Sequence, residues 1–119
     1  MTLIVPSNWL AGLVKQSFLR DYPVEVRYNS INTSVFKPTE SDFRQRHGLE
    51  DKFMVLGVAS VWNGRKGLDD FIELSKRLDD RFRIVLVGLN KKQLAALPEN
   101  IVGIAHTDSP EELAGIRHF

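Results

Sequence analysis

Residues 53–68 of the chain read FMVLGVASVWNGRKGL. The first part of this stretch, residues 53–59, is nearly all apolar, which is typical of a β-strand covered on both faces of a sheet. A turn containing Gly64 and Gly67 follows, and apolar residues then recur from Leu68 to Leu78 at the spacing of one helical face. The stretch therefore predicts a strand, a turn and a helix, the unit from which parallel sheets are built.

The same alternation continues toward the C-terminus. Residues 82–87 and 101–105 are further apolar runs, and a short helix is expected between them after Asn90. Ser109 and Pro110 then begin a last helix, because serine can cap it and proline suits its first position. Strands that alternate with helices predict an α/β fold with a Rossmann-like parallel sheet flanked by helices and connected by right-handed crossovers.

The N-terminal part begins with a short apolar strand at residues 3–5, which Pro6 ends. Ser7 is expected to cap the helix that follows, since its hydroxyl can accept a free backbone N–H. The predicted buried face of this helix consists of Leu10, Leu13, Val14, Ser17 and Phe18.

A strand at residues 24–28 and an irregular segment at 29–38 connect the two halves. Thr39 is expected to begin a short polar helix with Asp42 at its third position, and Gly48 to end it.

We therefore divide the chain into residues 1–22, the end of one domain, a linker at 23–38, and residues 39–119, the first half of another. The last helix has barely begun where the sequence stops, and a sheet of three strands has two open edges. This pattern predicts a fragment of a longer architecture. A small complete domain with covered edges is the alternative.

The composition excludes several classes of protein. A formal net charge of +1 argues against nucleic-acid and membrane-surface binding by bulk electrostatics. The absence of cysteine excludes disulfides, cysteine zinc sites and thiol catalysis. The absence of cysteine also fits the cytoplasmic setting that we expect. No apolar run approaches the roughly 20 residues of a transmembrane helix, so we expect no transmembrane segment. His47 and His118 are not part of a metal-binding pattern.

The turn at residues 60–67 is the richest in functional groups. In open parallel sheets ligands bind beyond the carboxyl ends of the strands. Arg65 and Lys66 bring two positive charges to a helix N-terminus that already favours anions, and Gly67 permits close approach of a ligand. This combination suits a diphosphate, although both cations could also be solvated surface residues. Acidic residues farther along, including Asp69 and Asp70, are interpreted as the outer face of the helix.

Two further turns follow the next strands. Gly88 and Leu89 could form a second wall of a ligand site or simply precede a helix, and His106 could contact a ligand or be exposed. Trp62 could stack on a ring or pack beneath its own loop.

Taken together, these motifs resemble those of glycosyltransferase family 4, the retaining group 1 enzymes of GT-B fold. Residues 57–68 are similar to the donor-binding turn of that family, and residues 84–88 to its next strand. Residues 28–32 and 36–38 resemble the family's interdomain linker, and residues 5–7 the end of its acceptor domain. The motifs cover essentially the whole chain and occur in the family's order.

The resemblance implies an incomplete GT-B C-terminal domain preceded by the end of an acceptor domain. It implies transfer of a sugar from a nucleotide-diphosphate sugar to a glycan or lipid-linked hydroxyl acceptor, with retention and without a metal or cofactor. Peripheral contact of the full-length enzyme with a membrane is compatible with this setting. Lys66 matches the lysine that contacts the donor diphosphate, Gly67 follows it, and Arg65 adjoins it. Gly88, Leu89 and His106 are weaker candidates for contacts with the donor nucleotide.

The chain also departs from the family pattern. Ala59 and Ser60 stand where the family usually has Gly-Arg, so one diphosphate-binding cation is replaced by Ser60, and a substitution by Arg65 is a hypothesis. Ser30 and Asn32 replace the usual linker glycine and aspartate. The family's Glu-x7-Glu motif is absent, so catalytic residues stay unassigned and we expect the isolated chain to be inactive as a transferase. A non-catalytic α/β phosphate-binding or protein-interaction module is the alternative function. A receiver domain fits poorly, because no acidic pair follows the strand at 53–59.

Overall fold

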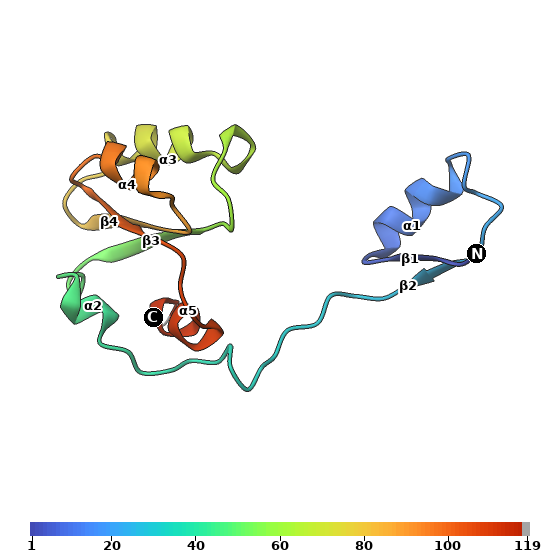
Figure 1. Ribbon diagram of the computed structural model, residues 1–119, viewed down its shortest axis with the longest axis horizontal. Coiled ribbons are helices and arrows are strands. Elements are labelled where there is room, and N and C mark those ends of the chain that lie inside the picture. The colour runs from blue at the N-terminus through green and yellow to red at the C-terminus, as the bar shows by residue number, and fades with distance from the viewer. Residues whose placement is uncertain (118–119) are drawn as a thin grey trace. The chain divides into compact units, whose positions relative to one another are not determined.

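The computed structural model describes residues 1–117 and contains two compact units, Met1–Asn32 and Thr33–Phe119. Both units are mixtures of helices and parallel strands, shown in Figure 1. We describe each unit by itself. Among the described residues, no helix combines the length and the apolar character that crossing a bilayer requires.

The first unit is a two-stranded parallel sheet with one helix. Strand β1 (Leu3–Val5) pairs with β2 (Val24–Val26), and helix α1 (Asn8–Lys15) connects them. The Ser7 hydroxyl accepts a hydrogen bond from the N–H of Leu10 at 3.1 Å, which confirms the predicted cap. Strand β2 is shorter than the predicted 24–28. Its partner β1 ends before Pro6, so the N–H of Arg27 makes the last bond to it, at the carbonyl of Val5.

The predicted buried face of α1 is wrong at its C-terminal end. The helix ends at Lys15, and the side chain of Phe18 is 90% exposed. Ser17 explains this end. Its hydroxyl donates to the Val14 carbonyl at 2.8 Å and accepts from the N–H of Leu19 at 3.1 Å, and such local bonds compete with continuation of a helix. Leu13 is also largely exposed.

The second unit is built on a three-stranded parallel sheet in the order β3-β4-β5. Its strands are β3 (Phe53–Val58), β4 (Phe82–Val87) and β5 (Ile101–Ile104). Its helices are α2 (Phe43–Arg46), the 3₁₀ turn η1 (Gly64–Lys66), α3 (Leu68–Ser75), α4 (Lys91–Ala96) and α5 (Pro110–Ile116). Both sheets of the protein are parallel and flanked by helices, which is the α/β class that the alternation of strands and helices predicts.

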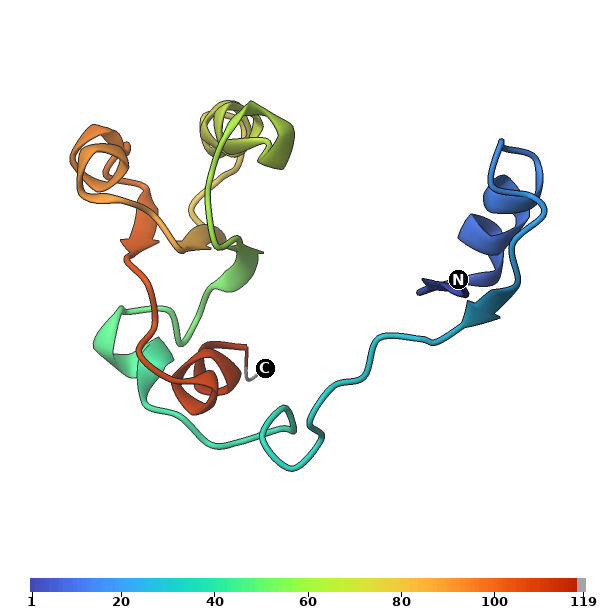
Figure 2. The same ribbon diagram turned by 45° about the vertical axis from the view of Figure 1, so that its right-hand side comes forward.

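Helices cover both faces of this sheet. Figures 1 and 2 show α3 and α4 on one face and α2 and α5 on the other. Under α3 and α4, Ile84 and Leu86 of β4 pack with Trp62 and residues of both helices. Under α2 and α5, Val85 and Val87 of β4 pack with residues that include Phe43 and Ile116. Strand β4 is therefore buried on both faces, as its continuous apolar sequence predicts.

Helix α2 begins later than predicted. Its first residue is Phe43 and its cap position is Asp42, whereas Thr39 lies in the preceding loop and donates its hydroxyl to the Lys37 carbonyl at 3.0 Å. The Ser41 hydroxyl accepts the N–H of Phe43 at 3.2 Å. The side-chain bond to the first turn of α2 therefore comes from Ser41, whereas the sequence pattern predicted a helix that begins at Thr39. The predicted stop at Gly48 is confirmed, since its φ is +61°.

The remaining helix starts agree with the sequence. Asn90 caps α4, its side chain accepting from the N–H of Gln93 at 2.9 Å, and the Gln93 side chain accepts the N–H of Asn90 in return. Ser109 caps α5 by accepting the N–H of Glu112 at 3.1 Å, with Pro110 in the first turn.

Candidate functional site

The three turns that the sequence analysis singled out lie at one edge of the second sheet. They follow β3, β4 and β5, whose carboxyl ends meet because the strands are parallel. Backbone bonds join them: the N–H of Ala59 donates to the Val87 carbonyl at 3.1 Å, and the N–H of Gly88 donates to the Ile104 carbonyl at 3.0 Å. The edge is thus one continuous surface, of the kind that binds ligands in open α/β sheets.

The first turn contains a short 3₁₀ helix that the sequence analysis did not predict. Asn63 caps it, with its side-chain oxygen 3.2 Å from the N–H of Lys66. Gly67 joins it to α3 with φ at +73°, in the left-handed region. A residue with a Cβ is strained there, so glycine is required at this position by the change of direction between the two helices.

The side chains of Arg65 and Lys66 are both exposed at this turn. They lie immediately before the N-terminus of α3, which confirms the predicted order of cations, glycine and helix. Two backbone donors of the turn are already used. The N–H of Lys66 is bonded to Asn63, and the N–H of Gly67 donates to the Gly64 carbonyl at 3.2 Å. These two N–H groups are therefore not available to an anion.

Two carboxylates follow these cations in the sequence. Asp69 and Asp70 occupy the first turn of α3. The Oδ2 atom of Asp70 is 3.0 Å from the position that a Cβ on Gly67 would take. Carboxylates at a helix N-terminus stabilise the helix, but they compete with an incoming anion for the same positive end. From the sequence, Asp69 and Asp70 were expected only on the outer face of the helix, although their position just after Leu68, the first residue of α3, already indicates this competition.

Trp62 packs beneath the first turn. Its side chain is 5% exposed, its Nε1–H donates to the Val87 carbonyl at 2.9 Å, and its ring meets that of Phe71 edge to face at 5.6 Å. The Nε2 of Gln93 donates to the Trp62 carbonyl at 3.0 Å. Of the two alternatives open for this residue, packing under the loop is the one in the structure. The side chain of Trp62 ties the turn to α3 and β4, and its backbone carbonyl ties the turn to α4.

The second turn is closed to ligands at its start. Gly88 is buried with φ at +96°, and a Cβ there would lie 1.7 Å from the carbonyl oxygen of Ala59. Leu89 is 1% exposed, and its N–H donates to the Ile104 carbonyl at 3.2 Å. The N–H groups of both residues are bonded to the chain itself. The glycine at position 88 thus allows the ends of β3 and β4 to approach each other closely.

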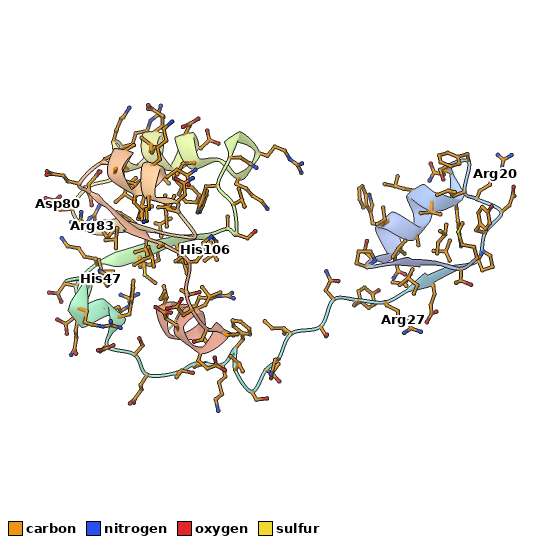
Figure 3. All side chains as sticks on the ribbon, in the orientation of Figure 1. Arg20, Arg27, His47, Asp80, Arg83 and His106 are labelled. Carbon is orange, nitrogen blue, oxygen red and sulfur yellow. The ribbon has the colours of Figure 1, made fainter. Side chains whose placement is uncertain are left out.

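The third turn places His106 on the exposed segment that leaves β5, labelled in Figure 3. The other histidines are elsewhere. His47 ends α2 with its ring 4.4 Å from that of Phe43, and His118 lies outside the described residues. Within residues 1–117, no three His, Cys, Asp or Glu side chains are grouped so that they could hold a metal ion. Ser60 lies two positions after the end of β3 and is exposed.

Comparison of the chain with protein-family models, with curated proteins and with solved structures finds no match.

Proposed function

We propose that the chain serves in the transfer of a sugar from a nucleotide-diphosphate sugar, as the donor side of a GT-B glycosyltransferase of family 4. The turn at residues 60–67 would bind the donor diphosphate. The observation that carries the proposal is the exposure of Arg65 and Lys66 together, directly before α3 and at the carboxyl edge of a parallel sheet. That is the position where the family resemblance expects the diphosphate.

The two cations have complementary roles in this proposal. Lys66 is a compact charge that can neutralise one phosphate, whereas the planar guanidinium of Arg65 can bind two phosphate oxygens at once. Both would stabilise the charge that develops on the diphosphate as it leaves the sugar. Ser60 can donate one hydrogen bond but carries no charge, so Arg65 is our candidate for the cation that the family pattern places at Ser60.

The carboxylates of Asp69 and Asp70 set the strength of this site. Two positive and two negative side chains occupy the turn and the first turn of α3, so the local charge is close to balanced. We therefore expect weak binding of a nucleoside diphosphate, because attraction by the cations is partly offset by repulsion from the carboxylates. Binding should also weaken as ionic strength rises, since these groups are exposed.

Isothermal titration calorimetry with nucleoside diphosphates tests the proposal. Replacement of either cation, Lys66→Ala or Arg65→Ala, should weaken binding about tenfold, the order expected for loss of one charge-assisted contact. The matched control is Lys76→Ala, which removes an exposed lysine from the other end of α3, where it pairs with Glu73 at 2.6 Å. Unchanged affinity in Lys66→Ala would remove this turn from the site.

A non-catalytic phosphate-binding or protein-interaction module is the second candidate. The balanced charge at the turn favours it, because a dedicated diphosphate site usually has an excess of positive charge. Titration with inorganic pyrophosphate separates the two functions. A donor site should bind the nucleoside diphosphate more tightly than pyrophosphate, whereas equal affinity would favour the non-catalytic module.

A further inference from the structure

The pair Asn63-Gly64 lies in the turn that follows β3, and it is the one place in the sequence where glycine follows asparagine. Both residues are exposed. The side-chain amide of an asparagine can react with the backbone nitrogen of the next residue, because the two groups are already held within one chain. Glycine favours this reaction, since it has no Cβ that obstructs its nitrogen. The turn therefore contains a reactive pair whose chemistry is separate from anion binding.

The space beside Gly64 is open. A Cβ on this residue would meet nothing within 4 Å apart from its own chain neighbours. Gly88 at the same edge differs, since a Cβ there would lie 1.7 Å from the carbonyl oxygen of Ala59. The backbone of Asn63 is extended, with φ at −149° and ψ at −179°. Ring closure needs a rotation about this ψ, which brings the Gly64 nitrogen toward Cγ of Asn63, and the open space beside Gly64 permits it.

The hydrogen bonds that hold this turn are local. The Oδ1 atom of Asn63 accepts the N–H of Lys66 at 3.2 Å, and the same N–H lies 3.0 Å from the Asn63 carbonyl oxygen. Release of the side chain therefore leaves this donor bonded to the backbone. A further bond joins the N–H of Gly67 to the Gly64 carbonyl at 3.2 Å. Short exposed turns open locally at a small cost in free energy, so the cap slows the reaction of Asn63 without preventing it.

We infer that Asn63 is a site of spontaneous deamidation, which converts the cap of this turn into a carboxylate. The backbone nitrogen of Gly64 attacks Cγ of Asn63, a C–N bond forms, and the Cγ–Nδ2 bond breaks. The proton of the backbone N–H leaves with the Nδ2 group as ammonia. Water then opens the cyclic imide at one of its two carbonyl carbons. Opening at Cγ gives aspartate and opening at the main-chain carbon gives isoaspartate, so water is the co-reactant and nothing is oxidised.

Both products change the charge of the turn. Aspartate caps a helix about as well as asparagine, but residues 63–70 then carry three carboxylates and two cations. Isoaspartate also lengthens the main chain before Gly64 by one carbon atom, which displaces the cap from the N–H of Lys66. Either product should weaken binding of a diphosphate, because the added charge repels the anion. This consequence rests on the proposed function, whereas the deamidation itself does not.

Peptide mass spectrometry of the full chain, kept folded in mildly alkaline buffer, tests the inference. We expect deamidation at Asn63 to exceed that at every other asparagine, with both aspartate and isoaspartate among the products. The internal control is Asn90, which is also exposed and caps a helix through a side-chain bond of 2.9 Å, but is followed by Lys91. Fragmentation of the peptides at their N–Cα bonds distinguishes the two products.

The Gly64→Ala variant supplies the matched comparison. Alanine has a Cβ that obstructs the backbone nitrogen, and the structure leaves room for it at this position. Deamidation at Asn63 should fall to the level of Asn90 in this variant, and circular dichroism confirms that the variant folds. Equal modification of Asn63 and Asn90 in the unchanged chain would overturn the inference. The same holds for modification of Asn63 only after unfolding in urea, for an unchanged rate in Gly64→Ala, and for aspartate as the sole product.

Calorimetry of an Asn63→Asp variant tests the consequence for the candidate site. This variant reproduces the aspartate product and should bind a nucleoside diphosphate several-fold more weakly than the unchanged chain, because of the added carboxylate. The control is Gln45→Glu, which makes the same exchange of an exposed amide for a carboxylate on α2, on the opposite face of the sheet from α3 (Figure 1). Equal affinity of Asn63→Asp and the unchanged chain would contradict this consequence. If the unchanged chain did not bind the nucleotide, the proposed function would fail, while the mass-spectrometric result on Asn63 would stand.

Discussion

Replacement of Gly88 by alanine should sharply destabilise the second unit. The new Cβ would lie 1.7 Å from the carbonyl oxygen of Ala59 and 2.9 Å from its carbonyl carbon, so the ends of β3 and β4 would have to separate. The φ of +96° adds strain of about 1–2 kcal/mol for a residue with a Cβ. Forced repacking of a close contact adds about 1–3 kcal/mol. We expect a loss of roughly 2–5 kcal/mol in the free energy of unfolding.

Urea unfolding followed by far-ultraviolet circular dichroism measures this loss. The matched control is Gly64→Ala at the same edge, where a Cβ would meet nothing within 4 Å and the φ is not positive. That variant should unfold within about 1 kcal/mol of the unchanged chain. If Gly88→Ala unfolded at the same urea concentration as Gly64→Ala, the close contact between the two strand ends would be refuted.

Three other changes give distinct expectations. Trp62→Phe removes a buried hydrogen bond to the Val87 carbonyl and part of the packing under the turn, so the unfolding free energy should fall by about 2–3 kcal/mol in the same urea assay. Asp70→Asn removes a carboxylate beside Gly67 and should strengthen nucleoside diphosphate binding in calorimetry, and weaker binding would contradict the competition that we describe. Hydrogen bonds from Arg81 hold the pKa of the Asp79 carboxyl below its usual value. That stabilisation is present above about pH 4 and is lost as the pH falls through the lowered pKa. Arg81→Ala should therefore raise the pKa of Asp79 in a carbon-13 NMR titration without changing nucleotide binding.

Local signals explain what could be predicted from the sequence. The strands at residues 53–59, 82–87 and 101–105 are apolar runs, and their order with the helices sets the parallel sheet. Ser7 and Ser109 cap helices through bonds to residues three positions away, which a pattern in the sequence contains completely.

Features that depend on competition between neighbours were not predictable in the same way. Ser41 and Asp42 follow Thr39 within three positions, and each residue type can cap a helix, so the cap pattern alone did not distinguish a start at Thr39 from the start at Phe43, whose N–H the Ser41 hydroxyl accepts. Phe18 continued the apolar spacing of α1, but the local bonds of Ser17 ended the helix first.

Contacts between residues distant in the sequence account for the rest of the site. A glycine after an apolar strand predicts a close approach of something to the backbone, and a sequence cannot say whether this is a ligand or the chain itself. At Gly88 the group that approaches the backbone is the carbonyl of Ala59, which lies 29 positions earlier in the sequence. The sequence likewise left open whether Trp62 stacks on a ligand ring or packs beneath its loop. The hydrogen bond from its Nε1–H to the carbonyl of Val87, a residue 25 positions later, shows that it packs beneath the loop.

The candidate site thus divides into a rigid base and an exposed charged rim. Trp62 and Gly88 hold the ends of β3 and β4 against each other. The backbone N–H groups of Gly88 and Leu89 are both bonded within the chain, so neither is free to bind a ligand. The backbone of Gly88 and Leu89 therefore gives a diphosphate no donor, and the exposed side chains of Arg65 and Lys66 are the candidate contacts, followed in the sequence by the carboxylates of Asp69 and Asp70. Substitutions in the base should therefore change stability, whereas substitutions in the rim should change affinity. A site in which Lys66→Ala altered the unfolding free energy as much as Trp62→Phe would not have this division.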